Sequence, residues 1–595
     1  MGLLHEEYDQ YLRHDTDRLT RIKRNLRSLV LLRLFSFTAI ALSLILLMRV
    51  SPLLAWISAV GFLVLFLYAI KVFFKREKEK ELYGRLIGIN NNEKLALDET
   101  FDQFADGTEF TDPHHPFSFD LDLFGTGSLF QYLNRTVLAG GKEKLAFSLS
   151  DVPTDARTIE ERQEAINELS ALTRWRQYFA AHGNGRHGQE LTFTRHANEP
   201  VLLKNPSLFK WNFIIFPAAC ISVLLMCSWS LFPWSVFFLF YTVNILILLI
   251  HRKKTEAFYQ VFGKQTKILD NYLELLRLTE TKVFQSPLLK QIQAPLLEQG
   301  QKASDITGRL QKIVSRFEYR SNVLFIAIGQ FIFLHDLICT YQLDRWQRKY
   351  GTHIIRWLNA LNELDALSSL ANMNHNHPEW TLPVINRNDF CIAANELAHP
   401  LIPSVKRIGN DFRMNGKGQL VILTGANMAG KSTFLRTLGI NMILAMNGCR
   451  VCASSMTLKP TGLFTNMRTT DNLRKEESYF FAELHRLQRM LQVLEGGSPV
   501  FMIIDEMLKG TNSKDKLEGS TALIKKIIRL NGNAIVATHD LHLTELAPKF
   551  PANIVNMCFN VDLSSGKLLF DYKLRNGVTH TMNAGFLMKK MGITD

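Results

Sequence analysis

The residues best suited to bind phosphate form one short motif in the last third of the chain. Residues 425–433 read GANMAGKST, between an apolar run at 421–424 and a helix-like stretch at 434–446. A G-x-x-x-x-G-K-[ST] pattern between a strand and a helix is typical of a phosphate-binding loop, in which backbone N–H groups and a helix N-terminus surround phosphate oxygens. Lys431 would contact the β- and γ-phosphates, and the Ser432 hydroxyl would ligate Mg²⁺. The expected nucleotide-binding residues are Gly425, Asn427, Met428, Gly430, Lys431, Ser432 and Thr433.

Two later apolar runs end in polar residues that could complete a hydrolytic site. Residues 499–506 (PVFMIIDE) read as a buried strand ending in two carboxylates. Asp505 would hold the hydration shell of Mg²⁺, and Glu506 would polarise the attacking water. Residues 533–539 (NAIVATH) end in His539, which would sense the γ-phosphate. Taken alone, these could be an ordinary strand end and a structural histidine; after the phosphate-binding loop they predict a Mg²⁺-dependent ATP hydrolase with Lys431, Glu506 and His539 as catalytic residues.

Two more segments fit the same site. Ser478 stands where a helical pattern begins within 476–484 (EESYFFAEL). A serine there is usually an N-cap, but it could also present its hydroxyl and the helix dipole to a phosphate. Residues 509–514 (KGTNSK) form a loop directly after the two carboxylates.

The order of these motifs resembles the ATPase domain of the MutS mismatch-repair family, a branch of the ABC ATPases. The Asn-Met pair inside the phosphate loop and the DE-x-x-x-G-T acid loop are the most specific features. Further upstream, residues 123–136 (LFGTGSLFQYLNRT) and 363–371 (ELDALSSLA) resemble the start and end of the MutS core. The resemblance extends over roughly 120–595 and is strongest after residue 360.

The resemblance implies a homodimer in which two ATPase domains pair and share their ATP sites. Ser478 would then contact the γ-phosphate bound by the partner subunit, and Asn512 would line the dimer seam. Arg407 stands where the family commonly has an aromatic residue that stacks on adenine. An arginine can stack through its planar face, but the departure leaves the selectivity for adenine open.

Four apolar runs are long enough to cross a bilayer as helices: 29–48, 52–70, 213–231 and 234–250. Each pair is separated by a short turn, so they predict two transmembrane hairpins. Four buried core helices are the alternative, although such helices seldom lack a polar face. Lys and Arg residues flank the outer ends of both hairpins, which predicts a multi-pass protein of the cytoplasmic membrane with its N-terminus and ATPase domain in the cytoplasm.

The expected fold is therefore an α/β P-loop ATPase domain of the MutS/ABC type, C-terminal to an all-α core and lever region, with two transmembrane hairpins. The expected segments are a basic cytoplasmic N-terminus at 1–28, a hairpin at 29–74, a linker at 75–122, the first part of the core at 123–205, a hairpin at 211–251, lever and core helices at 252–395, and the ATPase domain at 396–595.

The net charge of +14 suits an anionic partner, which could be a nucleic acid or the inner membrane surface. The leading hypothesis is a membrane-anchored MutS-like ATPase that binds DNA and closes its dimer on ATP. The sequence is expected to lack the N-terminal mismatch-recognition domain with its Phe-x-Glu wedge, because the first hairpin stands in its place. The alternative is an ATPase scaffold that acts on a membrane or protein partner. An ABC-type transporter is disfavoured because the apolar runs carry no ionisable residues at mid-membrane depth.

Overall fold

The computed structural model describes residues 2–183, 206–262, 266–321, 334–468, 479–564, 567–579 and 593. Ser478 and most of the apolar run after residue 321 lie outside these ranges. The chain divides into two compact units, Met1–Gln103 with Thr173–Asn184, and Phe104–Leu172 with Gly185–Asp595.

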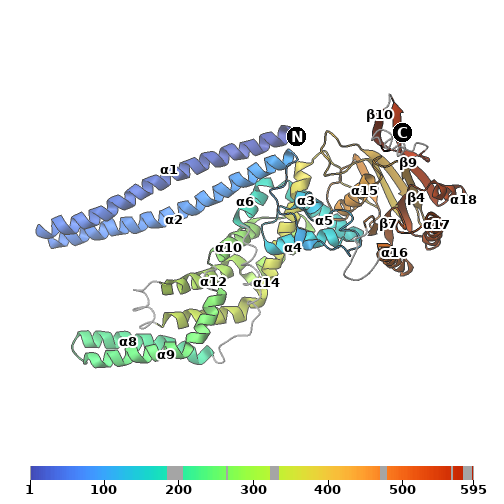
Figure 1. The fold of residues 1–595 in the computed structure, drawn as a ribbon. Helices are drawn as coiled ribbons and strands as arrows, with labels where there is room; N and C mark the ends of the chain where they lie inside the picture. The colour runs from blue at the N-terminus through green and yellow to red at the C-terminus, as the bar shows by residue number, and fades with distance from the viewer. Residues whose placement is uncertain are drawn as a thin grey trace. The chain divides into compact units, whose positions relative to one another are not determined.

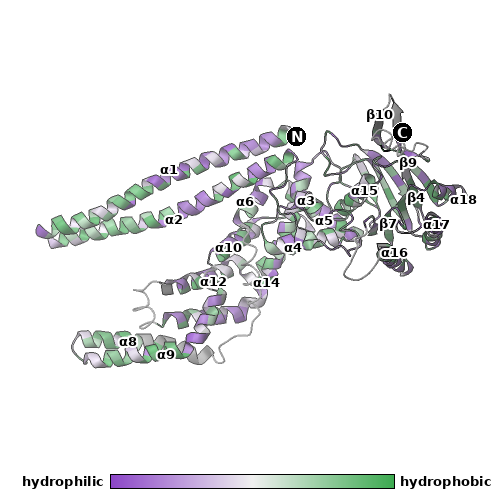
Figure 2. Ribbon diagram, viewed as in Figure 1, coloured by the Kyte–Doolittle hydropathy of each residue, from purple (hydrophilic) through white to green (hydrophobic). Residues whose placement is uncertain are grey.

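The first unit is a long helical hairpin. Helix α1 (Gly2–Leu46) and helix α2 (Pro52–Leu97) lie side by side, joined by a short turn (Figure 1). Small residues such as Ser36, Ala55 and Ala59 are buried in the hairpin, while large apolar residues such as Leu31 and Trp56 are exposed. Small side chains allow helix backbones to approach closely. The hydrophobic residues concentrate in the half of the hairpin next to the turn (Figure 2).

Three described helices are long and apolar enough to cross a membrane: Gly2–Arg49, Pro52–Leu97 and Trp234–Lys253. They correspond to three of the four expected spans. The fourth corresponds to helix α8 (Pro206–Ser228), in which a shorter apolar stretch, Ala218–Ser228, is found. Helix α9 (Trp234–Phe262) packs against α8.

The expected linker at 75–122 is wrong in its first part, because α2 continues without a break to Leu97. Pairs of opposite charge one turn apart, such as Arg76 with Glu79 and Lys80 with Glu77, support this polar half of the helix. The expected separate N-terminal segment at 1–28 is likewise the first half of α1.

Helix α6 (Thr173–Gly183), which was expected in the core at 123–205, belongs instead to the hairpin unit. Its Arg174 donates to both oxygens of the fully buried Asp15 on α1, at 2.7 and 2.9 Å. Its Gln177 donates to Asn90 on α2 at 2.7 Å. Three helices thus share one buried polar network, which fixes α6 on the hairpin.

The second unit begins with helices that pack around one long helix, α14 (His335–Asn376). Val137 and Leu138 donate their N–H groups to Asp365 of α14, and a Cβ at Gly141 would lie 2.2 Å from that carboxylate. The N–H of Arg135 also donates to Ser369 Oγ at 2.8 Å, so the two segments that resemble the start and end of the MutS core are in contact. The other helices here are α3 (Leu129–Leu133), α4 (Ala139–Ser150), α5 (Ala156–Ser170), α10 (Thr266–Thr281), α11 (Pro287–Gln293) and α12 (Ala303–Phe317).

The C-terminal part holds a six-stranded sheet in the order β10-β9-β4-β8-β7-β6, parallel except for β10 at one edge. The strands are β4 (Leu420–Gly425), β6 (Gly462–Asn466), β7 (Val500–Asp505), β8 (Asn533–Ala537), β9 (Ile554–Ser564) and β10 (Lys567–Asn576). Helices α16 (Tyr479–Glu495) and α17 (Ser513–Arg529) share a core with residues such as Ile422 and Met502. Helix α15 (Lys431–Met446) packs against β4, β7 and β8, with its Gly439 close to Ile503.

A smaller sheet, in the order β1-β5-β2-β3, is formed by β1 (Val384–Ile385), β2 (Cys391–Leu397), β3 (Asn410–Asn415) and β5 (Ser455–Leu458). The expected start of the ATPase domain at residue 396 falls inside β2, so that boundary is too late. The mixed α/β sheets and the helical N-terminal part agree with the expected fold class.

Candidate functional site

The phosphate-binding motif forms the loop between β4 and α15, as the sequence predicts. Its backbone is left-handed at Met428 (φ 67°) and Gly430 (φ 105°). A Cβ at Gly430 would lie 3.1 Å from the ring of Tyr572, so this position favours glycine for both its conformation and its space. The left-handed conformation is costly for Met428, and such strain is found chiefly at functional sites.

Lys431 is the buried cation of the loop. Its Nζ donates to the carbonyl oxygens of Gly425 at 2.8 Å and Ala426 at 3.1 Å. Burial lowers the pKa of Lys431, while the nearby Asp505 and Glu506 oppose that effect. The ammonium group is therefore held at the centre of the loop with two carboxylates close by.

The predicted catalytic groups come together at the tips of three adjacent parallel strands. Ser432 Oγ donates to Asp505 Oδ2 at 2.5 Å. His539 Nε2 lies 3.1 Å from Glu506 Oε1 and 3.2 Å from Lys431 Nζ. One tautomer of the ring donates to Glu506, and the other accepts from Lys431. Burial, and then the charge of Lys431, lower the pKa of His539, which favours the neutral ring at pH 7.

These residues line a pocket of about 440 Å³. Three further residues in its wall were not named as site residues: Ala429, Lys509 and Tyr572. Lys509 begins the 509–514 loop that the sequence places after the two carboxylates, so its position could have indicated a role in the site. Tyr572 lies at an irregularity in the pairing of β9 with β10, far along the sequence from the phosphate loop, and it carried no such signal. The complete lining is Asn427, Met428, Ala429, Gly430, Lys431, Ser432, Thr433, Asp505, Glu506, Lys509, His539 and Tyr572.

Four predicted site residues do not line this pocket as described: Gly425, Arg407, Asn512 and Ser478. Gly425 is the last residue of β4, and its carbonyl accepts from Lys431 Nζ. Arg407 donates to the carbonyl oxygens of Pro400 and Ile402, and its guanidinium lies 5.6 Å from the centre of the Trp380 ring. Asn512 is the N-cap of α17 and accepts from Asp515 N–H at 2.9 Å. Ser478 lies outside the described residues.

The chemistry of the pocket fits a magnesium ion carried in by a nucleotide. Within the described residues, no group of three or more His, Cys, Asp or Glu side chains could hold a metal on its own. Mg²⁺ does not require such a group, because it keeps several waters and usually takes one or two protein oxygens together with phosphate oxygens. Ser432 Oγ and Asp505 Oδ2, in contact at the pocket wall, are oxygen ligands of this kind.

Fold and loop together define a P-loop nucleotide-binding domain. Residues 421–592 match the family model for MutS domain V. A DNA mismatch repair protein MSH4 from Arabidopsis thaliana is 31% identical over 196 residues, which cover 32% of this chain and 24% of that protein. A DNA mismatch repair protein MutS from Thermotoga maritima is 25% identical over 355 residues, covering 58% of this chain and 40% of that protein.

A MutS protein from Desulfovibrio desulfuricans is 30% identical over 239 residues, covering 39% of this chain and 25% of that protein. The C-terminal part of the chain is therefore similar to domain V of MutS proteins. The matched part spans between a quarter and two fifths of the length of these relatives.

Proposed function

We propose that the protein is a membrane-anchored MutS-like ATPase. The observation that carries the proposal is the convergence of Lys431, the Ser432–Asp505 pair and the Glu506–His539 pair in one pocket. Lys431 and the loop N–H groups bind the phosphates, and Ser432 and Asp505 hold Mg²⁺, which neutralises phosphate charge. Glu506 orients and polarises water, while His539 holds Glu506 in place and contacts the γ-phosphate.

Tyr572 is the proposed contact for the nucleotide base. Its side chain is 43% exposed in the pocket wall and faces the glycine of the phosphate loop. Aromatic stacking on a base is sequence-tolerant and contributes about 1–3 kcal/mol per base in nucleic-acid complexes. Arg407 is held by backbone carbonyls beside Trp380, so Tyr572 is the better candidate for the stacking role.

The membrane anchor consists of the α1–α2 hairpin and the α8–α9 pair. Their exposed large apolar residues support insertion, and the lysines and arginines beside the apolar stretches support a cytoplasmic location for the ATPase domain. In this arrangement the protein acts as a homodimer with shared ATP sites. The position of Asn512 supports the homodimer. It is exposed at the N-terminus of α17, in the loop that follows Asp505 and Glu506, and so is accessible to a partner subunit.

The partner acted on is DNA in the leading proposal, on the strength of the named relatives and the net charge of +14. The exposed apolar surface of α1–α2 favours a second candidate, an ATPase scaffold that acts on the membrane or on a protein partner. The two candidates share the ATPase site and differ in what accelerates it.

The test is the ATPase rate of the full chain in nanodiscs, with Mg²⁺, with and without duplex and branched DNA, at low and moderate salt. Stimulation by DNA that decreases as salt rises supports the DNA-directed ATPase, because phosphate contacts release counterions. A rate that responds to lipid composition but to no DNA supports the scaffold. Absence of any Mg²⁺-dependent turnover would overturn the ATPase proposal itself.

A further inference from the structure

The acid loop after β7 has an unfavourable backbone that something must hold in place. Glu506 and Leu508 both have left-handed conformations, with φ of 57° and 56°, and neither is a glycine. Non-glycine residues in this region carry strain and persist only where the surroundings fix them. The N–H of Glu506 donates to Ala537 O at 2.9 Å, which fixes the start of the loop.

The other end of the loop is held by a carboxylate from α16. Glu483 is 1% exposed, and its two oxygens accept the N–H groups of Leu508 at 2.6 Å and Lys509 at 3.0 Å. A buried carboxylate is stable only when it is hydrogen-bonded, and bonds to charged groups are the stronger kind. Phe480, one turn earlier, closes on Gly510, where a Cβ would lie 2.9 Å from the Phe480 Cβ.

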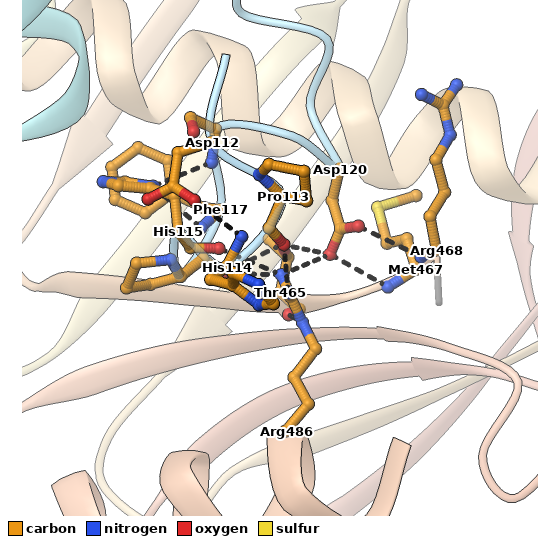
Figure 3. A network of polar contacts seen from close by, with 12 residues as sticks. Asp112, Pro113, His114, His115, Phe117, Asp120, Thr465, Met467, Arg468 and Arg486 are labelled. Atoms are coloured by element: carbon orange, nitrogen blue, oxygen red, sulfur yellow. Dashed lines mark hydrogen bonds and ion pairs between the residues drawn. The ribbon is translucent and has the colours of Figure 1, made fainter. Parts of the chain in front are cut away.

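Helix α16 is in turn anchored one turn later by Arg486. Its guanidinium donates to Thr465 O at 2.9 Å and to Asp120 Oδ2 at 3.0 Å. Asp120 is fully buried and also accepts from Thr465 Oγ1 and from the N–H groups of Met467 and Arg468, as Figure 3 shows.

The segment that carries Asp120 is seated on the helix of the phosphate loop as well. Leu121 is fully buried, and a Cβ at Gly439 of α15 would lie 2.8 Å from its side chain. Asp122 pairs with Arg436 of α15 at 3.1 Å and with Arg468 at 2.5 Å. Residues 120–122 therefore join the helix of the phosphate loop to the helix that holds the acid loop.

We infer that Glu483 is the positioning residue for Glu506, and that Arg486 and Asp120 fix the helix from which Glu483 acts. The inference rests on the proposed function, in which Glu506 activates water. Glu483 sets the direction of the Glu506 side chain through the backbone of the acid loop. Residues 104–123, which include Asp120 and Leu121, come after α2 in the chain and belong to the second unit.

The direct test replaces Glu483 by glutamine in the full chain. The amide keeps the shape of the side chain but turns an NH₂ group toward a backbone N–H, so one bond is lost. We expect kcat to fall about 10- to 100-fold, as expected for a misplaced catalytic group, with KM and the Kd for a fluorescent ADP analogue changed less than twofold. Amide hydrogen exchange in residues 506–510 should become faster.

The matched control is Glu168→Gln. Glu168 also accepts from two consecutive N–H groups, those of Gln285 at 2.8 Å and Ser286 at 2.7 Å, but it lies between α5 and α11. Its replacement should leave kcat and the exchange of 506–510 unchanged. Equal losses of kcat in both variants would identify a general effect on folding and overturn the specific role of Glu483.

A second variant, Arg486→Lys, tests the contacts that Arg486 makes with Thr465 and Asp120. Lysine keeps the positive charge but lacks the planar guanidinium group with its several donors. We expect a smaller fall in kcat, about threefold to tenfold, again without a change in KM. The control in the 104–123 segment is Glu109→Gln, which removes only a pair with Lys142 at the surface. An Arg486→Lys variant with wild-type kcat and wild-type exchange would remove the anchor from the proposal.

The two readouts separate this inference from the proposed function. Wild-type protein without turnover would overturn the ATPase proposal, while faster exchange at 506–510 in Glu483→Gln would still show that Glu483 holds the loop. Normal wild-type turnover with unchanged kcat and unchanged exchange in Glu483→Gln would overturn the inference and leave the ATPase proposal standing.

Discussion

The six-stranded sheet and the α1–α2 hairpin are both rich in apolar residues, but they use them in opposite ways. Strands β4 and β8 bury every residue, and the helices on both faces cover their side chains. In the apolar half of the hairpin many large residues, such as Leu31 and Trp56, are exposed, while Ser36, Ser43 and Ala59 are buried. Burial from water drives the first arrangement. The second is favourable only where the surroundings are themselves apolar, and this agrees with the proposed role of the hairpin as a membrane anchor.

The largest expected effect is a loss of ATP hydrolysis at the edge of the six-stranded sheet, without a change in the membrane association of the hairpin. Glu506→Gln should lower kcat by about 10²- to 10⁴-fold, because it removes the group that polarises water. The Kd for ATP, measured by fluorescence titration, should remain near the wild-type value. Turnover at the wild-type rate would show that Glu506 is not the activating base. Recovery in the membrane fraction serves as the control.

Lys431→Ala separates binding from chemistry in the same region. Loss of a charge-assisted hydrogen bond to phosphate costs about 1.5–3 kcal/mol, so the Kd for ATP should rise about 10- to 100-fold. Isothermal titration calorimetry measures the change. Unaltered affinity in Lys431→Ala would contradict the assignment of the loop as the nucleotide site. Membrane association should again be unaffected.

A charged residue introduced on the hairpin tests whether its exposed apolar residues contact lipid. Leu63 is 45% exposed on the apolar half of α2, and Leu95 is 47% exposed on its polar half. Leu63→Asp should oppose membrane insertion by about 2.5–3.5 kcal/mol, whereas in water an exposed Leu→Asp change costs little. Alkaline extraction of membranes should release a larger fraction of Leu63→Asp than of Leu95→Asp, with the α8–α9 pair as the remaining anchor of both. If both variants are retained equally, the apolar face is not in lipid.

The smallest expected effect concerns acid stability of the C-terminal part. Burial lowers the pKa of His399 to about 4, and its Nδ1 accepts from Leu401 N–H at 3.2 Å. The unfolded chain therefore binds a proton more readily between pH 6.5 and 4, so stability is lost as pH falls through this window. His399→Asn keeps an acceptor without a titratable group and should reduce the loss by about 1 kcal/mol, since the partly exposed ring is screened by solvent. Denaturant unfolding at pH 7 and pH 5 measures the free energy of unfolding of the wild type and of His399→Asn. If both proteins lose the same amount of stability, His399 is not the group responsible.

The site was largely predictable because its residues follow local rules. Asp505 and His539 stand at the ends of buried apolar runs, and Lys431 follows a third such run through the phosphate loop. Parallel strands bring such ends to one edge of a sheet. The exposed tyrosine at position 572 joins the site only through the irregular pairing of β10, which no short pattern encodes. Arg407 was expected at the base, but its backbone partners hold it beside Trp380.

The helical organisation was predictable in type and less so in extent. The change from apolar to charged residues near 75 suggested the end of a helix, but lysines, glutamates and leucines continue α2 to Leu97 because they are good helix formers. The docking of α6 on the hairpin depends on Asp15 and Arg174, which are 159 residues apart. Pairs so distant in sequence leave no periodic signal.

The docking of α6 also sets an order of events during synthesis. The hairpin and α6 form one compact unit, but residues 104–172 are made between them. Because synthesis proceeds at roughly 5–20 residues per second, several seconds pass between the synthesis of Asn90 and that of its partner on α6. During that interval Asp15 at the polar end of the hairpin has no arginine partner, so a ribosome stalled in this stretch would hold a hairpin with an unpaired carboxylate.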